Sequence, residues 1–301
     1  MTHATASPSH HRRLILILSS ERSGSTLTRV ILGENSRIVA PQELFLMRYP
    51  DYRTWRQQKP VAIESLIEFC TLIGEPHDAA WIDARCAGKS VLDAYRWMID
   101  LLPRNVLLLD KTPAYANDGA TLRRSLPLEP YYVWLIRHPL GVIESTVRLK
   151  VRERRRRDLR GLARALRDTA LDTLLRSAHG LTPLASQREV KWVVQQTVIR
   201  EFLATVPEER KAVVKFEHLV RNPEAVVRQL CTFLGVPVEE KMLAATAARK
   251  VMNVHLGDPN FHTHTTVEAG TADLWRRHFS EDRLTAETLR LMDAIGVVRD
   301  P

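Results

Sequence analysis

Cysteine is scarce in this sequence, which has only Cys70, Cys86 and Cys231 among its 301 residues. The three are far apart and form no CxxC pair or Cys/His cluster, so neither a disulfide framework nor a zinc site is indicated. A chain of this length buries a core large enough to fold without such cross-links. A reducing, cytoplasmic location therefore fits the cysteine content best.

Long apolar runs are missing as well. The run LILIL at 14–18 is too short for the core of a signal peptide or for a membrane span, and no other stretch reaches about 18 apolar residues. No membrane partner is therefore expected. The polar residues 1–12 are expected to form a disordered leader, and residues 13–301 a single domain.

Acidic residues are outnumbered by basic ones, and the formal net charge is +9. The sequence pI of about 9.7 favours an anionic partner, such as a nucleotide, a nucleic acid, an acidic protein or a membrane surface. Charge alone does not choose among these. Aromatic residues are not interleaved with the basic ones and no known nucleic-acid fold is recognisable, so nucleic acid is not expected.

Four short apolar or β-branched runs predict strands, at 14–18, 106–109, 131–136 and 211–216. Helical patterns separate them, at about 60–73, 89–102, 116–125, 140–150, 155–177, 187–205 and 223–235. Strands that alternate with helices predict an α/β fold with a mostly parallel sheet. A helical insertion is expected around 150–205, and the polar segment 253–270 is expected to be a long loop.

The first predicted strand is followed by the polar loop 19–24 and then by a helix. Such a loop lies at the carboxyl edge of a parallel sheet, where ligands bind. Ser23, Gly24, Ser25 and Thr26 are small enough for an anion to approach the backbone N–H groups of the helix, and Arg22 adds a positive charge. The alternative is an ordinary helix start capped by Ser or Thr.

The loop lacks the lysine of the GxxxxGK[ST] motif, because the residue after Gly24 is a serine. A P-loop nucleotide or small-molecule kinase is therefore disfavoured, although it remains an alternative. A second loop begins at Arg137, where the strand 131–136 ends, and Ser145 lies two turns along the next helix. These two side chains are suited to meet on one phosphate; otherwise they are a surface arginine and an ordinary helix serine.

The sequence RSGSTL at 22–27 resembles the 5'-phosphosulfate loop of sulfotransferases that use 3'-phosphoadenosine-5'-phosphosulfate (PAPS). Arg137 and Ser145 match the family's 3'-phosphate site, and FEHLVRNP at 216–223 followed by CTFLG resembles the segment that ends the last sheet strand. The resemblance implies a P-loop-like three-layer fold, with a central parallel sheet flanked by helices, and an enzyme that transfers a sulfuryl group from PAPS and releases 3'-phosphoadenosine-5'-phosphate (PAP). It also implies that the whole segment from Arg22 to Leu27 binds the nucleotide.

Two further segments, DKTPAYA at 110–116 and LGDPNFHTHTTVEAG at 256–270, resemble the sulfotransferase domains of bacterial polyketide synthases. Tyrosylprotein sulfotransferases are more distantly similar. The resemblance implies a hydroxyl acceptor, either a small molecule or a β-hydroxyacyl chain on an acyl carrier protein. No carrier segment is attached to this chain, so a free-standing enzyme is expected, and the acceptor itself is not specified by the sequence.

The resemblance also assigns roles within the site. Arg22 and Lys111 would stabilise the leaving phosphate, so that no metal is needed; otherwise Lys111 is a solvated lysine or an ion pair with Asp110. Glu43 and His262 are the two candidates for the base that takes the acceptor's proton.

Phe216 would lie beside the adenine, or is simply a core residue. Arg276 would cover the nucleotide, or is a surface arginine. The arginine-rich run 148–160 is either the exposed face of a helix or a docking patch for an acidic carrier protein or an anionic acceptor. A basic adaptor that binds nucleic acid or acidic protein through this run is the remaining alternative to an enzyme.

Overall fold

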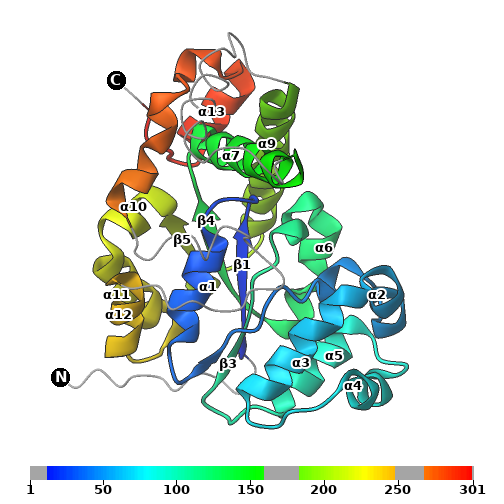
Figure 1. Ribbon diagram of the computed structural model, residues 1–301. Coiled ribbons are helices and arrows are strands. Elements are labelled where there is room, and N and C mark those ends of the chain that lie inside the picture. Colours follow the sequence, from blue (N-terminus) through cyan, green and yellow to red (C-terminus); the bar gives the residue numbers. More distant parts are fainter. Residues whose placement is uncertain (1–11, 159–182, 248–267, 300–301) are drawn as a thin grey trace, which may run out of the picture.

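The computed structural model describes residues 12–158, 183–247 and 268–299. At its centre lies a parallel sheet with the strand order β2-β3-β1-β4-β5 (Figure 1). The strands are β1 (Leu14–Ser19), β2 (Ile38–Val39), β3 (Leu107–Asp110), β4 (Tyr131–Ile136) and β5 (Lys211–Lys215). Strands β2 and β3 lie on one side of β1, and strands β4 and β5 lie on the other. Strand β1 is therefore at the topological switch point, where α/β folds bind ligands.

Helices cover both faces of the sheet. They are α1 (Ser25–Gly33), α2 (Tyr52–Gln58), α3 (Ile63–Leu72), α4 (Ala79–Cys86), α5 (Val91–Asp100), α6 (Gly119–Arg124), α7 (Pro139–Asp158), α9 (Pro183–Leu203), α10 (Phe216–Arg221), α11 (Pro223–Leu234), α12 (Glu240–Ala247) and α13 (Ala286–Ala294). Helices α1, α10, α11 and α12 pack on one face around Ile15 and Ile17. The remaining helices pack on the other face around Leu14, Leu16 and Leu18.

This arrangement confirms the predicted α/β fold with three layers and a parallel sheet. Side chains of β1 alternate between the two cores because successive residues of a strand point to opposite faces. All six residues of β1 are buried, which explains why the strand is a continuous apolar run and not an alternating one.

The four predicted strands are all present, and the differences are local. Strand β2 has only two residues and leaves no pattern to detect. Phe216 was predicted to end the strand at 211–216, but it is the first residue of α10. Helices α2, α4, α10, α12 and α13 were not predicted. Of these, α2 and α4 bury only two side chains each, and their sequences are largely polar.

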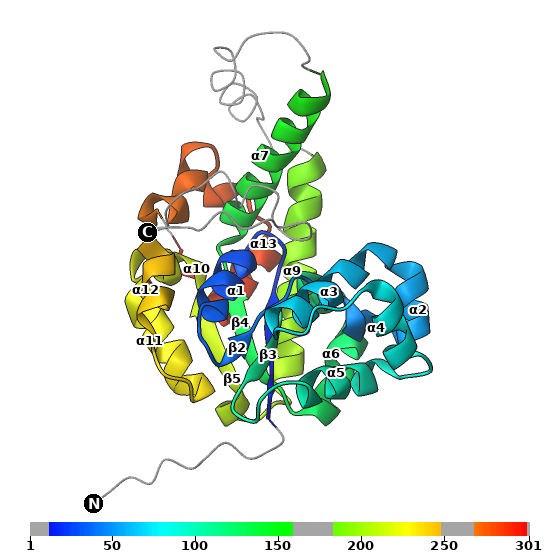
Figure 2. The same ribbon diagram turned by 60° about the horizontal axis from the view of Figure 1, so that its bottom comes forward.

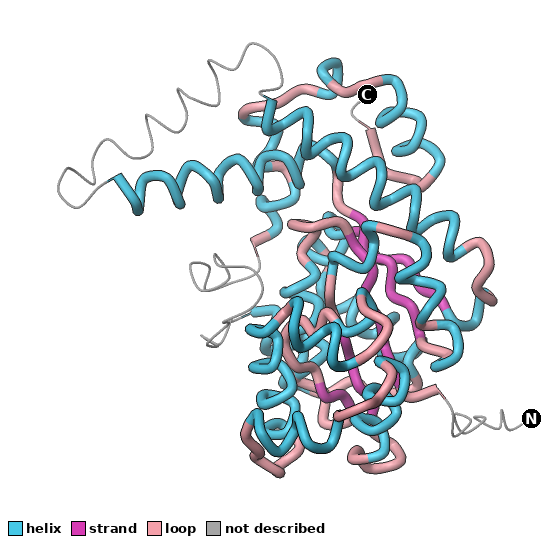
Figure 3. The backbone as a smooth tube through the Cα atoms, turned by 90° about the vertical axis from the view of Figure 1, so that its right-hand side faces the viewer, coloured by secondary structure: helices cyan, strands magenta, loops and turns pink. Residues whose placement is uncertain are grey.

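Helix α7 is longer than expected and continues without a break to Asp158. Its far end extends away from the sheet and past the start of α9 (Figures 2 and 3). The expected insertion at 150–205 is helical at 150–158 and 183–203, and its residues 159–182 lie outside the described part of the chain, as does most of the expected loop 253–270. In the part of the chain that the structure describes, no helix has the length and apolar character that a membrane span requires.

Candidate active site

The loop between β1 and α1 places backbone N–H groups at the carboxyl edge of the sheet. Arg22 and Gly24 both have positive φ, of 66° and 90°, and this tight geometry turns the chain into α1 at Ser25. No side chain caps the start of α1, since its N-cap residue is Gly24. The alternative of a Ser- or Thr-capped helix is therefore wrong, and the first-turn N–H groups are suited to an anion.

Gly24 is required by its backbone and by its neighbour. A Cβ atom at this position would lie 2.4 Å from Cδ2 of Phe216, which packs directly against the loop. Phe216 is 4% exposed and belongs to the core of the α1 side. The first loop is thus fitted onto the start of α10, a segment almost two hundred residues later in the chain.

Replacing Gly24 with alanine tests this fit, with Gly74→Ala as the matched control. Both glycines have positive φ, 90° and 81°, but nothing lies within 4 Å of a Cβ at Gly74. Each substitution carries a conformational cost of about 1–2 kcal/mol, and only Gly24→Ala also displaces Phe216, at about 1–3 kcal/mol more. We expect a lower melting temperature for Gly24→Ala than for Gly74→Ala by thermal unfolding; equal values would show that the contact with Phe216 is unimportant.

The two predicted loops meet. Arg22 donates a hydrogen bond from Nε to the Ser145 hydroxyl at 3.1 Å, and Arg137 donates from Nη1 to the carbonyl of Arg22 at 2.9 Å. Ser145 lies on α7 and is 6% exposed. Two loop arginines and a serine of α7, from segments more than a hundred positions apart in sequence, therefore form one cluster at the edge between β1 and β4.

Arg137 is a buried cation with unused hydrogen-bonding capacity. Its guanidinium lies over the Phe216 ring, 4.2 Å from the centroid, and its Nη2 donates to the Thr271 carbonyl at 3.4 Å. Burial lowers the pKa of Arg137 to about 10. Its Nε is buried and has no hydrogen-bond partner among the described residues, and a buried donor of this kind is suited to an anionic acceptor.

Phe216 accordingly has the packing of a core residue. The guanidinium of Arg137 covers one face of its ring, so adenine would stack on that face only if Arg137 moved. The predicted place of Phe216 beside adenine stays a prediction. Leu27 lies in the first turn of α1. Its side chain points into the core and is 3% exposed, so its backbone is the part that could face a bound anion.

Lys111 and Glu43 form an ion pair at the same edge of the sheet. The two groups are 2.6 Å apart, and the Lys111 ammonium also donates to the Thr26 hydroxyl of the first loop at 3.3 Å. Lys111 is 1% exposed, so it is neither solvated nor paired with Asp110. Burial lowers the pKa of Lys111, and the charge of Glu43 acts in the opposite direction.

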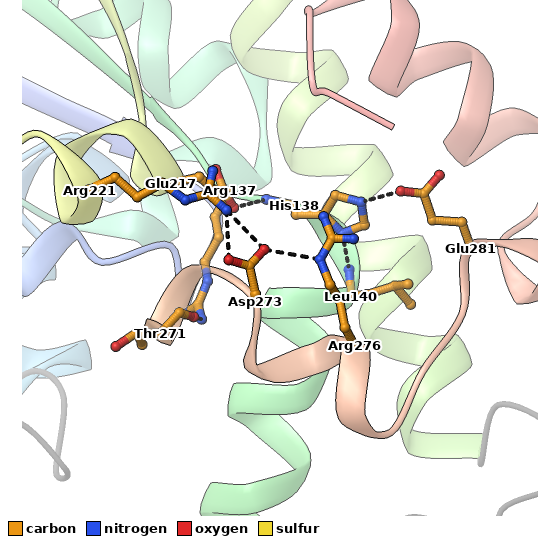
Figure 4. A network of polar contacts seen from close by, with 9 residues as sticks. All are labelled: Arg137, His138, Leu140, Glu217, Arg221, Thr271, Asp273, Arg276 and Glu281. Atoms are coloured by element: carbon orange, nitrogen blue, oxygen red, sulfur yellow. Dashed lines mark hydrogen bonds and ion pairs between the residues drawn. The ribbon is translucent and has the colours of Figure 1, made fainter. Parts of the chain in front are cut away.

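A C-terminal segment covers the second loop (Figure 4). The His138 ring stacks on Trp275 with 4.2 Å between centroids. Nδ1 of His138 accepts a hydrogen bond from the backbone N–H of Leu140 at 3.2 Å. The ring proton is therefore on Nε2, which donates to Glu281 at 2.9 Å. Burial lowers the pKa of His138, which agrees with a neutral ring.

Arg276 lies in this covering segment, and its predicted place over the nucleotide stays a prediction. Its Nε donates to Asp273 at 3.0 Å, and the same carboxylate accepts two bonds from Arg221 (Figure 4). The Arg276 guanidinium also rests over the Trp275 ring, 4.6 Å from the centroid. Its side chain is 44% exposed, so Arg276 is anchored at the surface of the segment that packs on the second loop.

Of the predicted site residues, only His262 lies outside the described part of the chain. Asp110, Asp273 and Trp275 were not predicted as parts of the site. Asp110 was considered only as a partner of Lys111, Trp275 only as the neighbour of Arg276, and no local pattern marks Asp273. Among the described residues, no group of three or more His, Cys, Asp and Glu side chains is arranged to hold a metal ion.

The fold and the site define an α/β protein in which two polar loops with basic side chains meet at one edge of a parallel sheet. The chain belongs to the sulfotransferase family, whose sequence profile, described as "Sulfotransferase family", matches residues 15–240. It is therefore an enzyme that transfers sulfuryl groups, and no protein with a curated description matches it in sequence.

Two solved structures are similar over nearly the whole chain. The sulfotransferase domain from the Synechococcus PCC 7002 olefin synthase has 27% identity and a TM-score of 0.77, and the match covers 97% of this chain and 98% of that one. The sulfotransferase domain from the curacin biosynthetic pathway has 29% identity and a TM-score of 0.76, with 96% and 99% covered. These matches confirm the resemblance to sulfotransferase domains of bacterial polyketide synthases.

Proposed function

We propose that this enzyme transfers the sulfuryl group of PAPS to a hydroxyl group and releases PAP. The observation that carries the proposal is the contact between the two loops, in which Arg22 bonds to Ser145 and Arg137 bonds to Arg22. One nucleotide with phosphates at both its 3' and 5' positions matches two adjoining anion sites.

The residues divide between the two ends of the nucleotide. Arg22, Ser23, Gly24, Ser25, Thr26 and the backbone of Leu27 would hold the 5'-phosphosulfate. Arg137 and Ser145 would hold the 3'-phosphate, with the buried Nε of Arg137 as a ready donor. Arg276 would close over the 3' side, because the segment that carries it already packs on the second loop through Trp275 and His138.

The proposed chemistry uses the Glu43–Lys111 pair. Glu43 takes the proton of the acceptor hydroxyl while the acceptor's oxygen forms a bond to sulfur. At the same time, the bond between sulfur and the bridging phosphate oxygen of PAPS breaks. Arg22 and Lys111 stabilise the negative charge that collects on this leaving oxygen, which is the main contribution of a protein to such a loose transition state. The Glu43 carboxylate lies 2.6 Å from the buried ammonium of Lys111, which places the proposed base next to the proposed cation. His262 is the second candidate for the base.

The proposed acceptor is a hydroxylated small molecule or a β-hydroxyacyl chain on an acyl carrier protein. Similarity to the sulfotransferase domains of an olefin synthase and of the curacin pathway supports the second class. The arginine-rich end of α7 extends from the body of the molecule (Figure 3), and its net positive charge would suit an acidic carrier protein.

Thermal unfolding with three ligands tests the proposed function against the kinase and the adaptor alternatives. PAP at 100 times its dissociation constant adds about 2.7 kcal/mol of stability, which raises the melting temperature of a chain this long by a few degrees. We expect this shift with PAP, and none with ATP and Mg²⁺ or with duplex DNA. A shift with ATP and Mg²⁺ alone would favour the kinase, and one with DNA alone the adaptor.

A further inference from the structure

A fully buried carboxylate lies at the end of β3 and has no part in the chemistry above. Asp110 has 0% exposure. It accepts hydrogen bonds from the hydroxyl groups of Tyr95 and Tyr115, the latter at 2.7 Å, and from Thr112 at 2.8 Å. The backbone N–H of Leu44 also donates to it. Burial raises the pKa of Asp110, and these four hydrogen bonds act in the opposite direction.

These donors belong to the two segments that carry the Glu43–Lys111 pair. Leu44 directly follows Glu43 in the chain, and Thr112 directly follows Lys111. The Thr112 hydroxyl, which donates to Asp110, also accepts the backbone N–H of Phe45 at 3.3 Å. Asp110 and Thr112 therefore fasten the Glu43 loop to the end of β3 through two backbone bonds.

The rest of the Glu43 loop is held from its other side. Ser65 of α3 donates to the Glu43 carbonyl at 3.0 Å, and the Trp55 indole donates to the Leu44 carbonyl at 2.8 Å. Both contacts anchor the loop to the helical layer, whereas the bonds to Asp110 and Thr112 join the backbone of the loop to the strand end that carries Lys111. These backbone bonds therefore help to set the distance between the Glu43 carboxylate and the Lys111 ammonium.

Asp110 does not take Lys111 as its own partner. Lys111 turns instead to Glu43 and Thr26, as expected when neighbouring residues at a strand end point to opposite sides. The charged groups that act on Lys111 are Glu43 and Asp110, which raise its pKa, and Arg29, which lowers it. Arg29 is buried on α1 and is 3% exposed.

We infer that Asp110 is the positioning residue of the Glu43–Lys111 pair: through Leu44 and Thr112 it sets the Glu43 carboxylate opposite the Lys111 ammonium. This inference rests on the proposed function, because it assigns Asp110 a role in the same reaction. It requires no contact between Asp110 and either substrate.

Two variants separate the position of Glu43 from the charge of Asp110. Asp110→Asn removes the charge and spoils the acceptor pattern. Thr112→Val keeps the shape and every charge but removes the hydroxyl that links Phe45 to Asp110.

The titration of the Lys111 amine is read by NMR on the ligand-free full chain, with 13C at the lysine ε carbons and the signal assigned by its loss in Lys111→Ala. Transfer is measured with 35S-labelled PAPS and a β-hydroxyacyl thioester of pantetheine as the probe acceptor.

We expect both variants to titrate Lys111 at lower pH than the wild type. Asp110→Asn removes a negative charge that stabilises the Lys111 ammonium. Thr112→Val removes a hydrogen bond that holds the Glu43 loop in place, so the Glu43 carboxylate should move away from the ammonium. The alkaline limb of the rate profile should move to lower pH in parallel. Turnover should fall about 10- to 100-fold in Asp110→Asn and less in Thr112→Val, as for a base moved out of position, while PAP binding stays within about threefold.

Asp83→Asn is the matched control, because Asp83 likewise accepts a tyrosine hydroxyl, from Tyr52, and pairs with Arg56 far from the site. It should lower the melting temperature without moving the Lys111 titration. A wild-type Lys111 titration in Thr112→Val would overturn the inference, even if Asp110→Asn does not fold. Failure of the wild-type chain to bind PAP would instead overturn the proposed function.

Discussion

Glutamine in place of Glu43 is expected to lower the rate of sulfuryl transfer by about 100- to 1000-fold, the usual contribution of a general base. The amide keeps the size of the side chain but cannot take the acceptor's proton. Lys111 also loses the partner that lies 2.6 Å away, and since Glu43 raises the pKa of Lys111, residual activity should disappear at lower pH than in the wild type. Initial rates measured with 35S-labelled PAPS across a pH series give both results.

The control for this variant is Glu64→Gln, which removes the same charge from an exposed position on α3. It should leave the rate unchanged. PAP affinity should change by no more than about threefold in Glu43→Gln, because Glu43 is proposed to act on the acceptor and not on the nucleotide. Near-normal turnover in Glu43→Gln would remove the base role from Glu43 and leave it to His262 or to another group.

Lysine in place of Arg137 is expected to weaken PAP binding by about 10- to 100-fold, which corresponds to one charge-assisted hydrogen bond of about 1.5–3 kcal/mol. Lysine keeps the charge but has neither the planar fork that bonds to the carbonyls of Arg22 and Thr271 nor the flat face that lies on Phe216. Isothermal titration with PAP measures the effect. Alanine is a poorer test because it would leave a cavity at a buried position.

Arg210→Lys is the matched control. Arg210 is also buried, at 7% exposure, lies over the Tyr132 ring and donates to the Pro130 carbonyl at 3.2 Å. It stands beside the opposite end of β4, away from both loops. The two variants should lose comparable stability, and only Arg137→Lys should lose affinity for PAP; equal affinities in both would exclude Arg137 from the 3'-phosphate site.

The place of the first-loop site was predictable because its signals are local. Buried parallel strands are continuous apolar runs, and the polar residues that follow such runs must emerge at the carboxyl edge of the sheet. Arg22, Lys111 and Arg137 each follow a strand end, so their convergence on one edge was expected before any coordinates. Glu43 follows the two-residue strand β2, which has no such signal, and it was assigned only through the family resemblance.

The class of fold, four of the five strands and the three cations at the sheet edge could be predicted from the sequence, because periodicity and strand ends depend on a few neighbouring residues. The folded structure was needed to show that Lys111 pairs with Glu43 and not with Asp110, that Phe216 supports Gly24 and Arg137, and that Asp273 joins Arg221 to Arg276. These contacts join segments between about 50 and 190 residues apart in the chain, except the local contact of Asp273 with Arg276, and packing in three dimensions selects among partners that the chain alone leaves equivalent.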